Sequence, residues 1–254
     1  MLKYWIYLKQ TKYIGVISTL FLISAPIFGQ VPGGFDVNIG SFVSPEGFSS
    51  SINLLLALSS ISLIPFFLVS TTAFLRIIIV LSMLRQALQT QQSPPNSVMI
   101  ALALFLTIFV MSPTWNQINK LAVNPYQEGQ INQREALNQG TLIFKKHMLR
   151  FCKDNDLALF LEFSKVEKPK NYEDIPIFVV IPTYIISELK TAFQIGFLLF
   201  IPFLVIDLVI SNILLSLGMF MLSPAMVSLP FKILLFVLTD GWNLIVRGLM
   251  LSIQ

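Results

Sequence analysis

Charged residues are scarce in this 254-residue sequence, and so are cysteine and histidine. Asp, Glu, Lys and Arg make up 12% of the residues, roughly half their usual share in a soluble globular domain. A surface with so few charges suits lipid or a large protein assembly better than water. The single cysteine, Cys152, excludes an intrachain disulfide and any metal cluster held by several thiolates.

The motifs of common catalytic sites are missing as well. The sequence has no Walker loop, no zinc-ligand spacing and no nucleophile elbow. The one histidine, His147, lies between Lys146 and Met148 in a charged stretch, which favours a solvated side chain over a catalytic one. Asp207 and Asp240 could suggest a proton-sharing aspartyl dyad, but neither stands in the Gly-x-Gly-Asp motif of intramembrane aspartyl proteases. We therefore predict that the protein is not an enzyme and holds no cofactor or metal.

The excess of positive charge is small and does not point to nucleic acid. The formal net charge is +4, and much of it comes from three lysines at positions 3, 9 and 12. The central region is close to balanced and lacks the basic stripe that a phosphate backbone requires. We therefore predict no nucleic-acid partner.

Long apolar runs dominate the remaining sequence. Hydrophobic residues make up 55% of the chain, and the mean hydropathy is +0.75. No charged residue occurs in 48–75 or 86–119, and only six occur after residue 174. Because about 20 apolar residues span the hydrocarbon core of a bilayer, these runs predict an all-α membrane protein.

The N-terminus has the three parts of a cleavable secretory signal peptide, at residues 1–29. Three lysines precede the apolar run Ile14–Ile23, and small residues follow it. We predict cleavage after Gly29, with cleavage after Ala25 and an uncleaved first helix as the alternatives. Residues 30–51, rich in Gly, Ser and Pro, are expected to form an extracytoplasmic lead-in.

The first helical hairpin is expected at residues 52–112. Its two apolar segments, 52–75 and 98–112, are separated by the turn sequence Pro94–Asn96, and the second segment is expected to end before Pro113. That second segment measures only about 22 Å as a helix, short of the roughly 30 Å hydrocarbon core. The shortfall favours a helix that packs within protein or one that leaves the membrane at a hairpin tip.

The orientation follows from Arg76 and Arg85, which mark the cytoplasmic side by the positive-inside rule. Residues 113–185 mix apolar and charged residues at helical spacing. Since the hairpin returns the chain to the opposite side, we expect these residues to form an extracytoplasmic (periplasmic) helical domain.

The second helical hairpin is expected at residues 186–254. Pro202 is expected to bend its long apolar run, and Pro224 and Pro230 fit a turn before a last segment at 231–251. The fold prediction is therefore a set of bent helical hairpins with a helical extracytoplasmic domain.

Charged residues within these apolar stretches are costly, at about 2.5 to 3.5 kcal/mol near the centre of a membrane helix. Lys190 and Asp207 are too far apart to pair along one helix, so the partners must lie on other helices of this chain or of neighbouring subunits. We favour polar contacts between subunits, because no facing pair is evident; a solute or proton pathway is the alternative. The residues concerned are Glu188, Lys190, Asp207, Lys232 and, at the last turn, Asp240.

Several stretches together resemble the FliP family, the export-gate membrane proteins of flagellar type III secretion, called SctR in injectisomes. The resemblance runs in order from about residue 52 to the C-terminus. Its stretches are Arg76–Val80, Pro94–Asn96, Leu102–Thr107, Met111–Pro113, Ser187–Phe197, Phe200–Asp207, Leu229–Lys232 and Asp240–Trp242.

The resemblance implies an oligomeric helical export gate that forms the protein-conducting pore for unfolded flagellar subunits during flagellum assembly. It implies a homo-oligomer of five copies, together with FliQ-like, FliR-like and FlhB-like membrane proteins. The implied location is the flagellar basal body in the bacterial inner (cytoplasmic) membrane. Other components supply the energy, so the resemblance also implies no catalytic residues.

Met219, Phe220 and Met221 lie between Gly218 and Pro224. Taken alone, these residues fit ordinary core packing, since methionine fills irregular gaps. The resemblance makes them the pore gate, a ring of soft side chains contributed by several copies. Phe220 interrupts the family's usual methionine run.

Two alternative functions stay open. The first is an injectisome export-gate subunit, although injectisome members generally lack a signal segment. The second is a small-solute channel or transporter that uses Asp207 and Lys190.

Overall fold

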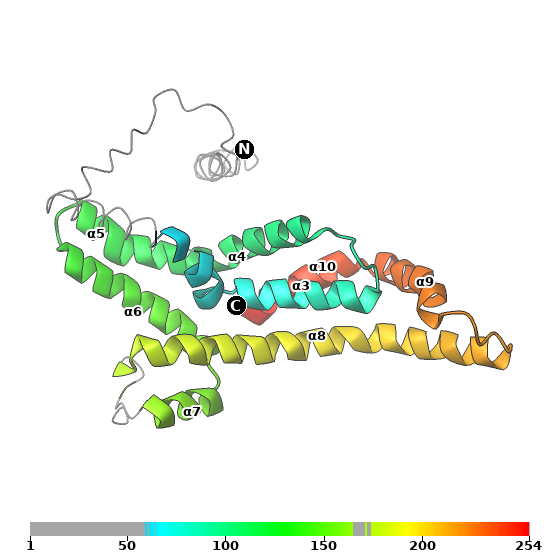
Figure 1. Ribbon diagram of the computed structural model, residues 1–254. Coiled ribbons are helices and arrows are strands. Elements are labelled where there is room, and N and C mark those ends of the chain that lie inside the picture. The colour runs from blue at the N-terminus through cyan, green and yellow to red at the C-terminus, as the bar shows by residue number, and fades with distance from the viewer. Residues whose placement is uncertain (1–58, 60, 64, 165–170, 172–173, 254) are drawn as a thin grey trace, which may run out of the picture. The chain divides into compact units, whose positions relative to one another are not determined.

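The computed structural model describes residues 59, 61–63, 65–164, 171 and 174–253. The predicted signal peptide and lead-in lie outside these residues. The described part is helical and contains no strand, which confirms an all-α fold. A first helix, Ile61–Thr71, is followed by the elements labelled in Figure 1. These are α3 (Phe74–Leu88), α4 (Asn96–Ile118), the π-helix η2 (Asn119–Val123), α5 (Asn124–Gln127), α6 (Gln133–Phe151), α7 (Asp154–Ser164), α8 (Ile177–Ser216), α9 (Pro224–Leu238) and α10 (Gly241–Ile253).

Two of these segments are long and apolar enough to cross a membrane. The first joins α4, η2 and α5 into 32 residues, and the second is α8, with 40 residues. At about 1.5 Å per residue, α8 measures about 60 Å, twice the hydrocarbon thickness. Two bent pairs, Ile61–Thr71 with α3 and α9 with α10, pass the same test of length and apolarity when each is taken as one broken span.

Helices α4 and α8 continue through internal prolines. The predicted helix end before Pro113 is wrong, because α4 continues through that residue to Ile118. Helix α8 begins at Ile177 and runs through both Pro182 and Pro202 without a break (Figure 1). An internal proline costs about 3 kcal/mol in an isolated helix, but neighbouring helices and local adjustments compensate for this in membrane proteins.

The predicted last segment, 231–251, is broken instead at Asp240. That residue has a φ of 51°, and the axes of α9 and α10 differ by 66° across it. Gly241 follows at a very tight position, where a Cβ atom would lie 2.3 Å from the Phe236 ring. The turn therefore needs both a residue that tolerates the left-handed region and a glycine after it.

Helix α3 lies at the centre of the larger of two hydrophobic cores. It runs beside α8 (Figure 1), and Ile77, Val80, Leu81 and Leu84 are almost fully buried between α8, α4 and the C-terminal helices. Gly196 brings α8 close, since a Cβ atom there would lie 2.2 Å from the Met83 sulfur.

A second, smaller core joins α6, α7 and the first turns of α8. It is built from Met148, Leu157, Ile175, Val180 and Tyr184, among others. The helices that follow α4 therefore have apolar packing of their own.

Candidate functional site: an apolar loop and buried ion pairs

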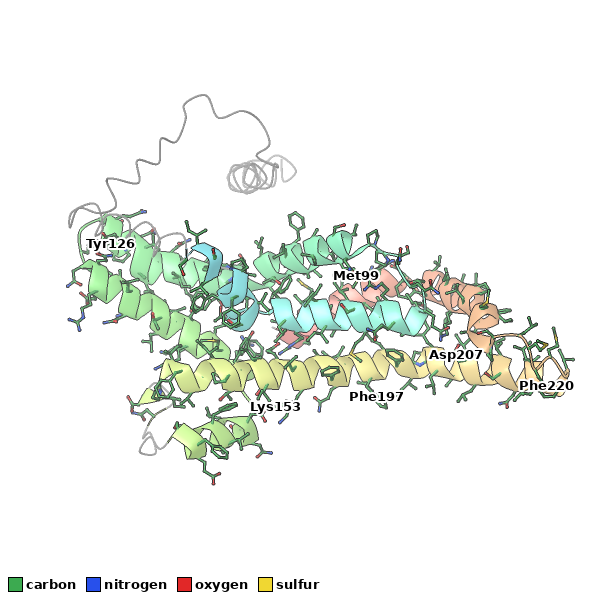
Figure 2. All side chains as sticks on the ribbon, viewed as in Figure 1. Met99, Tyr126, Lys153, Phe197, Asp207 and Phe220 are labelled. Atoms are coloured by element: carbon green, nitrogen blue, oxygen red, sulfur yellow. The ribbon has the colours of Figure 1, made fainter. Side chains whose placement is uncertain are left out.

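The loop between α8 and α9 projects from the end of α8, where Phe220 is labelled in Figure 2. Helix α8 ends in a left-handed Gly218, whose φ is 72°. The amide of Met219 then donates to the carbonyl of Leu214 at 2.9 Å, which closes the helix end. Pro224 starts α9, where its fixed φ suits the first helical position.

The predicted gate residues belong to a run of exposed apolar side chains that also includes Leu217, Leu222 and Met226. Met221 is 100% exposed, Phe220 is 76% exposed and Met219 is 43% exposed. Core packing within the chain, the simpler interpretation of these residues, is therefore wrong. A cluster of large apolar side chains without cover from its own chain marks a surface that contacts something else.

Lys232 and Asp207 form an ion pair between α9 and α8. Their Nζ and Oδ2 atoms lie 2.7 Å apart, with Lys232 1% exposed and Asp207 29% exposed. The ammonium also donates to the carbonyl of Ala87 at 3.2 Å, near the C-terminus of α3, where the helix dipole favours a cation. Ser228 and Gln89 donate to the same carboxylate, at 2.5 and 3.1 Å. Three helices are therefore joined at one buried cation.

Glu188 pairs with Arg76 at the opposite end of α3. The guanidinium donates to both carboxylate oxygens, from Nε at 2.7 Å and from Nη2 at 2.5 Å. Its Nη1 donates to the carbonyl of Ser252 in α10, and its Cζ atom lies 5.2 Å from the Phe151 ring centre. Both charged side chains are at least 96% buried. This bidentate pair joins α3, α8 and the C-terminal helix.

Lys190 pairs with Asp156 of α7 and is itself 54% exposed. Ser187 also donates to that carboxylate, at 2.9 Å, and accepts from the amide of Lys153. Burial alone would raise the pKa of Asp156, but hydrogen bonds from Lys190 and Ser187 and the nearby lysine charges lower it below the usual value. The aspartate is therefore held ionised, and α7 is fixed to α8.

The structure thus places a partner for each of the four predicted polar residues on another helix of the same chain. The pair of Arg76 and Glu188 is not evident from the sequence, because the two residues lie more than 100 positions apart and an arginine beside an apolar run also fits a membrane boundary. Asp207 and Lys232 lie closer in sequence, on the two arms of the expected second hairpin, and that signal could have found them. Contact of these residues with neighbouring subunits stays a prediction.

His147 is not solvated as predicted. It lies on α6 and is partly buried against α4, where Nδ1 is 3.3 Å from the Thr114 hydroxyl and the ring meets Phe151 edge to face. Burial, with the charges of Arg150 and Arg76, lowers its pKa to about 4, so the ring is neutral at physiological pH. Its Nε2 atom is buried without a hydrogen-bond partner among the described residues.

Cys152 follows α6 and is half-buried. Burial and the negative charges of Glu188 and Asp156 raise the pKa of its thiol to about 12. Little thiolate, the nucleophilic form, is therefore present at neutral pH.

Comparison with known proteins identifies the family. The FliP family model matches residues 57–249. The flagellar biosynthetic protein FliP of Bacillus subtilis (strain 168) is 51% identical over 216 residues, which cover 85% of this chain and 98% of the relative. The protein of that name from Aquifex aeolicus (strain VF5) is 45% identical, with 93% and 98% covered, and that from Pectobacterium carotovorum is 43% identical, with 95% and 93% covered. The predicted resemblance is confirmed: the chain belongs to the FliP family.

Proposed function

We propose that this chain is a structural subunit of the flagellar type III protein export gate. Several copies would surround a pore through which unfolded flagellar subunits pass during flagellum assembly. Extensive identity to flagellar biosynthetic proteins over nearly the whole chain is the observation that carries the proposal. The described residues include no group of three or more metal-ligating side chains, and the proposed role requires no catalytic step.

The exposed loop of Met219, Phe220 and Met221 is the proposed pore gate. Repeated around an axis, these side chains would meet and exclude water, and a dewetted constriction blocks ions. Their flexibility would let the same ring deform around a passing chain of any sequence. Full exposure of Met221 in the isolated subunit supports this role, because a gate residue needs its partners from other copies.

The proposed topology places the Arg85 end of α3 at the cytoplasmic side of the inner membrane. Residues 113–185 would then form the periplasmic domain, with residues 1–29 as a cleavable signal peptide and 30–51 as the lead-in. The separate core of α6, α7 and the start of α8 supports a distinct domain there.

Among the polar residues, Lys190 and Asp207 are the better candidates for contacts between subunits. Both keep exposed surface after pairing, whereas Glu188 and Lys232 are each 1% exposed and reach only their own chain. The proposed neighbours are four further copies and FliQ-like, FliR-like and FlhB-like membrane proteins.

Complementation tests the function. A flagellated bacterium that lacks its own FliP-family gene would receive this chain, and flagellin in the medium and swimming would be measured. We expect both to be restored, and the tagged chain to purify with two small membrane proteins and further copies of itself. Restoration of virulence-type secretion instead would identify an injectisome subunit. Solute flux through the isolated chain, without any co-purifying protein, would identify a channel.

A further inference from the structure

Two pockets, one apolar and one of mixed lining, meet at Arg85 on the last turns of α3. One is an apolar cavity of about 220 Å³, here called the tail pocket. The other is a wider cleft of about 570 Å³, here called the head pocket. Arg85 lines both, so one residue borders an apolar cavity and a cleft of mixed polar and apolar lining.

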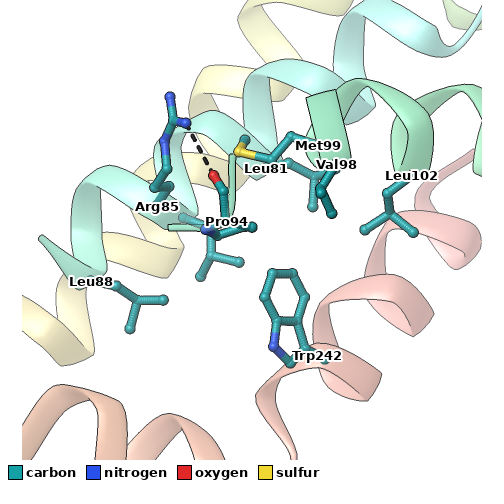
Figure 3. A pocket seen from close by; sticks show the side chains of 9 residues that line it. Leu81, Arg85, Leu88, Pro94, Val98, Met99, Leu102 and Trp242 are labelled. Atoms are coloured by element: carbon teal, nitrogen blue, oxygen red, sulfur yellow. Dashed lines mark hydrogen bonds between the residues drawn. The ribbon is translucent and has the colours of Figure 1, made fainter. Parts of the chain in front are cut away.

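The tail pocket is lined by residues of three helices and by Pro94 of the turn before α4 (Figure 3). Leu81, Leu84 and Leu88 of α3 form one wall, the start of α4 with Val98 forms another, and Trp242 of α10 closes the third side. The cavity exceeds the apolar cavity of about 150 Å³ that is known to bind benzene. It can therefore hold part of an aliphatic chain.

The head pocket has a mixed lining. Its polar part comes from Arg85 and three glutamines at positions 86, 89 and 91, and its apolar part comes from the N-terminal turns of α9. The amide of Gln89 already donates to Asp207, which leaves Arg85 as the cation of the pocket. Arg85 uses Nη1 to donate to the Pro94 carbonyl and to Asn96. Its Nε and Nη2 atoms make no hydrogen bond to the described residues, and no described carboxylate pairs with it. A positive group with free donors remains beside an apolar cavity.

We propose that this pair of pockets binds one anionic phospholipid. An acyl chain would enter the tail pocket, and the phosphate would accept hydrogen bonds from Nε and Nη2 of Arg85. The inference rests on the topology under the proposed function, which puts Arg85 at the cytoplasmic leaflet, where anionic lipids concentrate. A neutral apolar side chain from another subunit would leave the guanidinium without a counter-charge, which is why a lipid is favoured.

Trp242 provides the probe, because it lines the tail pocket and bromine on an acyl chain quenches tryptophan fluorescence. The full chain carrying Trp5→Phe and Trp115→Phe keeps Trp242 as its one tryptophan. It would be placed in phosphatidylcholine nanodiscs that contain increasing small fractions of a dibrominated lipid, either phosphatidylglycerol or phosphatidylcholine. We expect quenching by phosphatidylglycerol to half-saturate at a roughly fivefold lower fraction, the ratio equivalent to about 1 kcal/mol for one arginine near anionic lipid.

Variants separate the two pockets. Arg85→Gln should remove the preference for phosphatidylglycerol, and Arg85→Lys should keep it by retaining the charge. Arg134→Gln, which makes the same charge change at an exposed position of α6, should leave the preference for phosphatidylglycerol unaltered. Val98→Phe, which fills the tail pocket, should weaken saturable quenching by both lipids.

Equal half-saturating fractions for the two lipids in the parent chain would overturn the proposal. So would quenching that Val98→Phe does not weaken, since the tail pocket would then be empty or filled by protein. Either failure would leave complementation by the chain intact, whereas failed complementation with intact lipid selectivity would count only against the export function.

Discussion

Arg76, near the start of α3, donates from Nη1 to the backbone carbonyl of Ser252, 2.5 Å away in the last turn of α10. The same guanidinium holds Glu188 of α8 in a bidentate pair. One side chain therefore connects the first described core helix, the longest helix and the last helix of the chain.

Removing this connection should destabilise the subunit itself. We expect Arg76→Leu to lower the free energy of unfolding by about 3–5 kcal/mol, because Glu188 is left buried without its partner. The double variant Arg76→Leu with Glu188→Leu should recover much of the loss. Thermal unfolding of the detergent-solubilised chain measures both; equal damage in the single and double variants would contradict the pairing argument.

Lys190 and Lys232 should behave differently although both form ion pairs. Lys190 is mostly exposed, so Lys190→Met should change subunit stability by only about 0–1 kcal/mol. Lys232→Met should lower the free energy of unfolding by roughly 2–3 kcal/mol. The loss is smaller than for a fully buried pair, because Asp207, which would be left without its partner, is partly exposed to solvent. Stability measurements, combined with native gels of the complex, would show whether Lys190→Met weakens assembly without weakening the subunit.

The gate loop should be dispensable for folding. Replacing Met219, Phe220 and Met221 together by Ala should change subunit stability by no more than about 0.5 kcal/mol, because exposed surface positions contribute little. The assembled complex should then leak ions in a planar bilayer when no substrate is present. An intact complex with unchanged conductance would remove the gate role from these residues.

Gly196 should not tolerate a methyl group. Gly196→Ala places its Cβ against the Met83 side chain and should cost about 1–3 kcal/mol through overpacking. Met83→Ala should relieve the clash in the double variant. Gly140→Ala is the matched control, because its new Cβ meets nothing within 4 Å; similar losses at both glycines would argue against close packing of α3 on α8.

His147 should make stability depend on pH between about 6.5 and 4. Its pKa is lowered to about 4 in the folded chain, so the unfolded chain binds a proton that the folded chain does not. Stability is therefore complete above pH 6.5 and falls as the pH drops towards 4, by up to about 3 kcal/mol at about 1.4 kcal/mol per pKa unit. In the His147→Phe variant, the free energy of unfolding should depend much less on pH across this window. An unaltered pH dependence would mean that other titratable groups cause it.

The sequence predicted the helical class, the membrane segments and the family, because long uncharged runs and ordered motifs depend on local sequence alone. It failed at Pro113, where contacts with neighbouring helices outweigh local helix propensity. It also missed Arg76 as the partner of Glu188 and left His147 in solvent, since both facts depend on how distant helices pack. The exposure of the gate loop could not be read from apolar composition, which is equally compatible with a core.

The length of α8 gives the subunit a mechanical property. One end of this helix is fixed in the small core with α6 and α7, and the other end carries Gly218 and the gate loop. Over about 60 Å, a tilt of about 5° displaces the far end by about 5 Å. In the proposed gate, the distance of the loop from the pore axis would therefore depend on the angle of α8. Because α8 also packs along α3 and holds Asp207 against Lys232, a change in that angle would have to carry α3 and α9 with it.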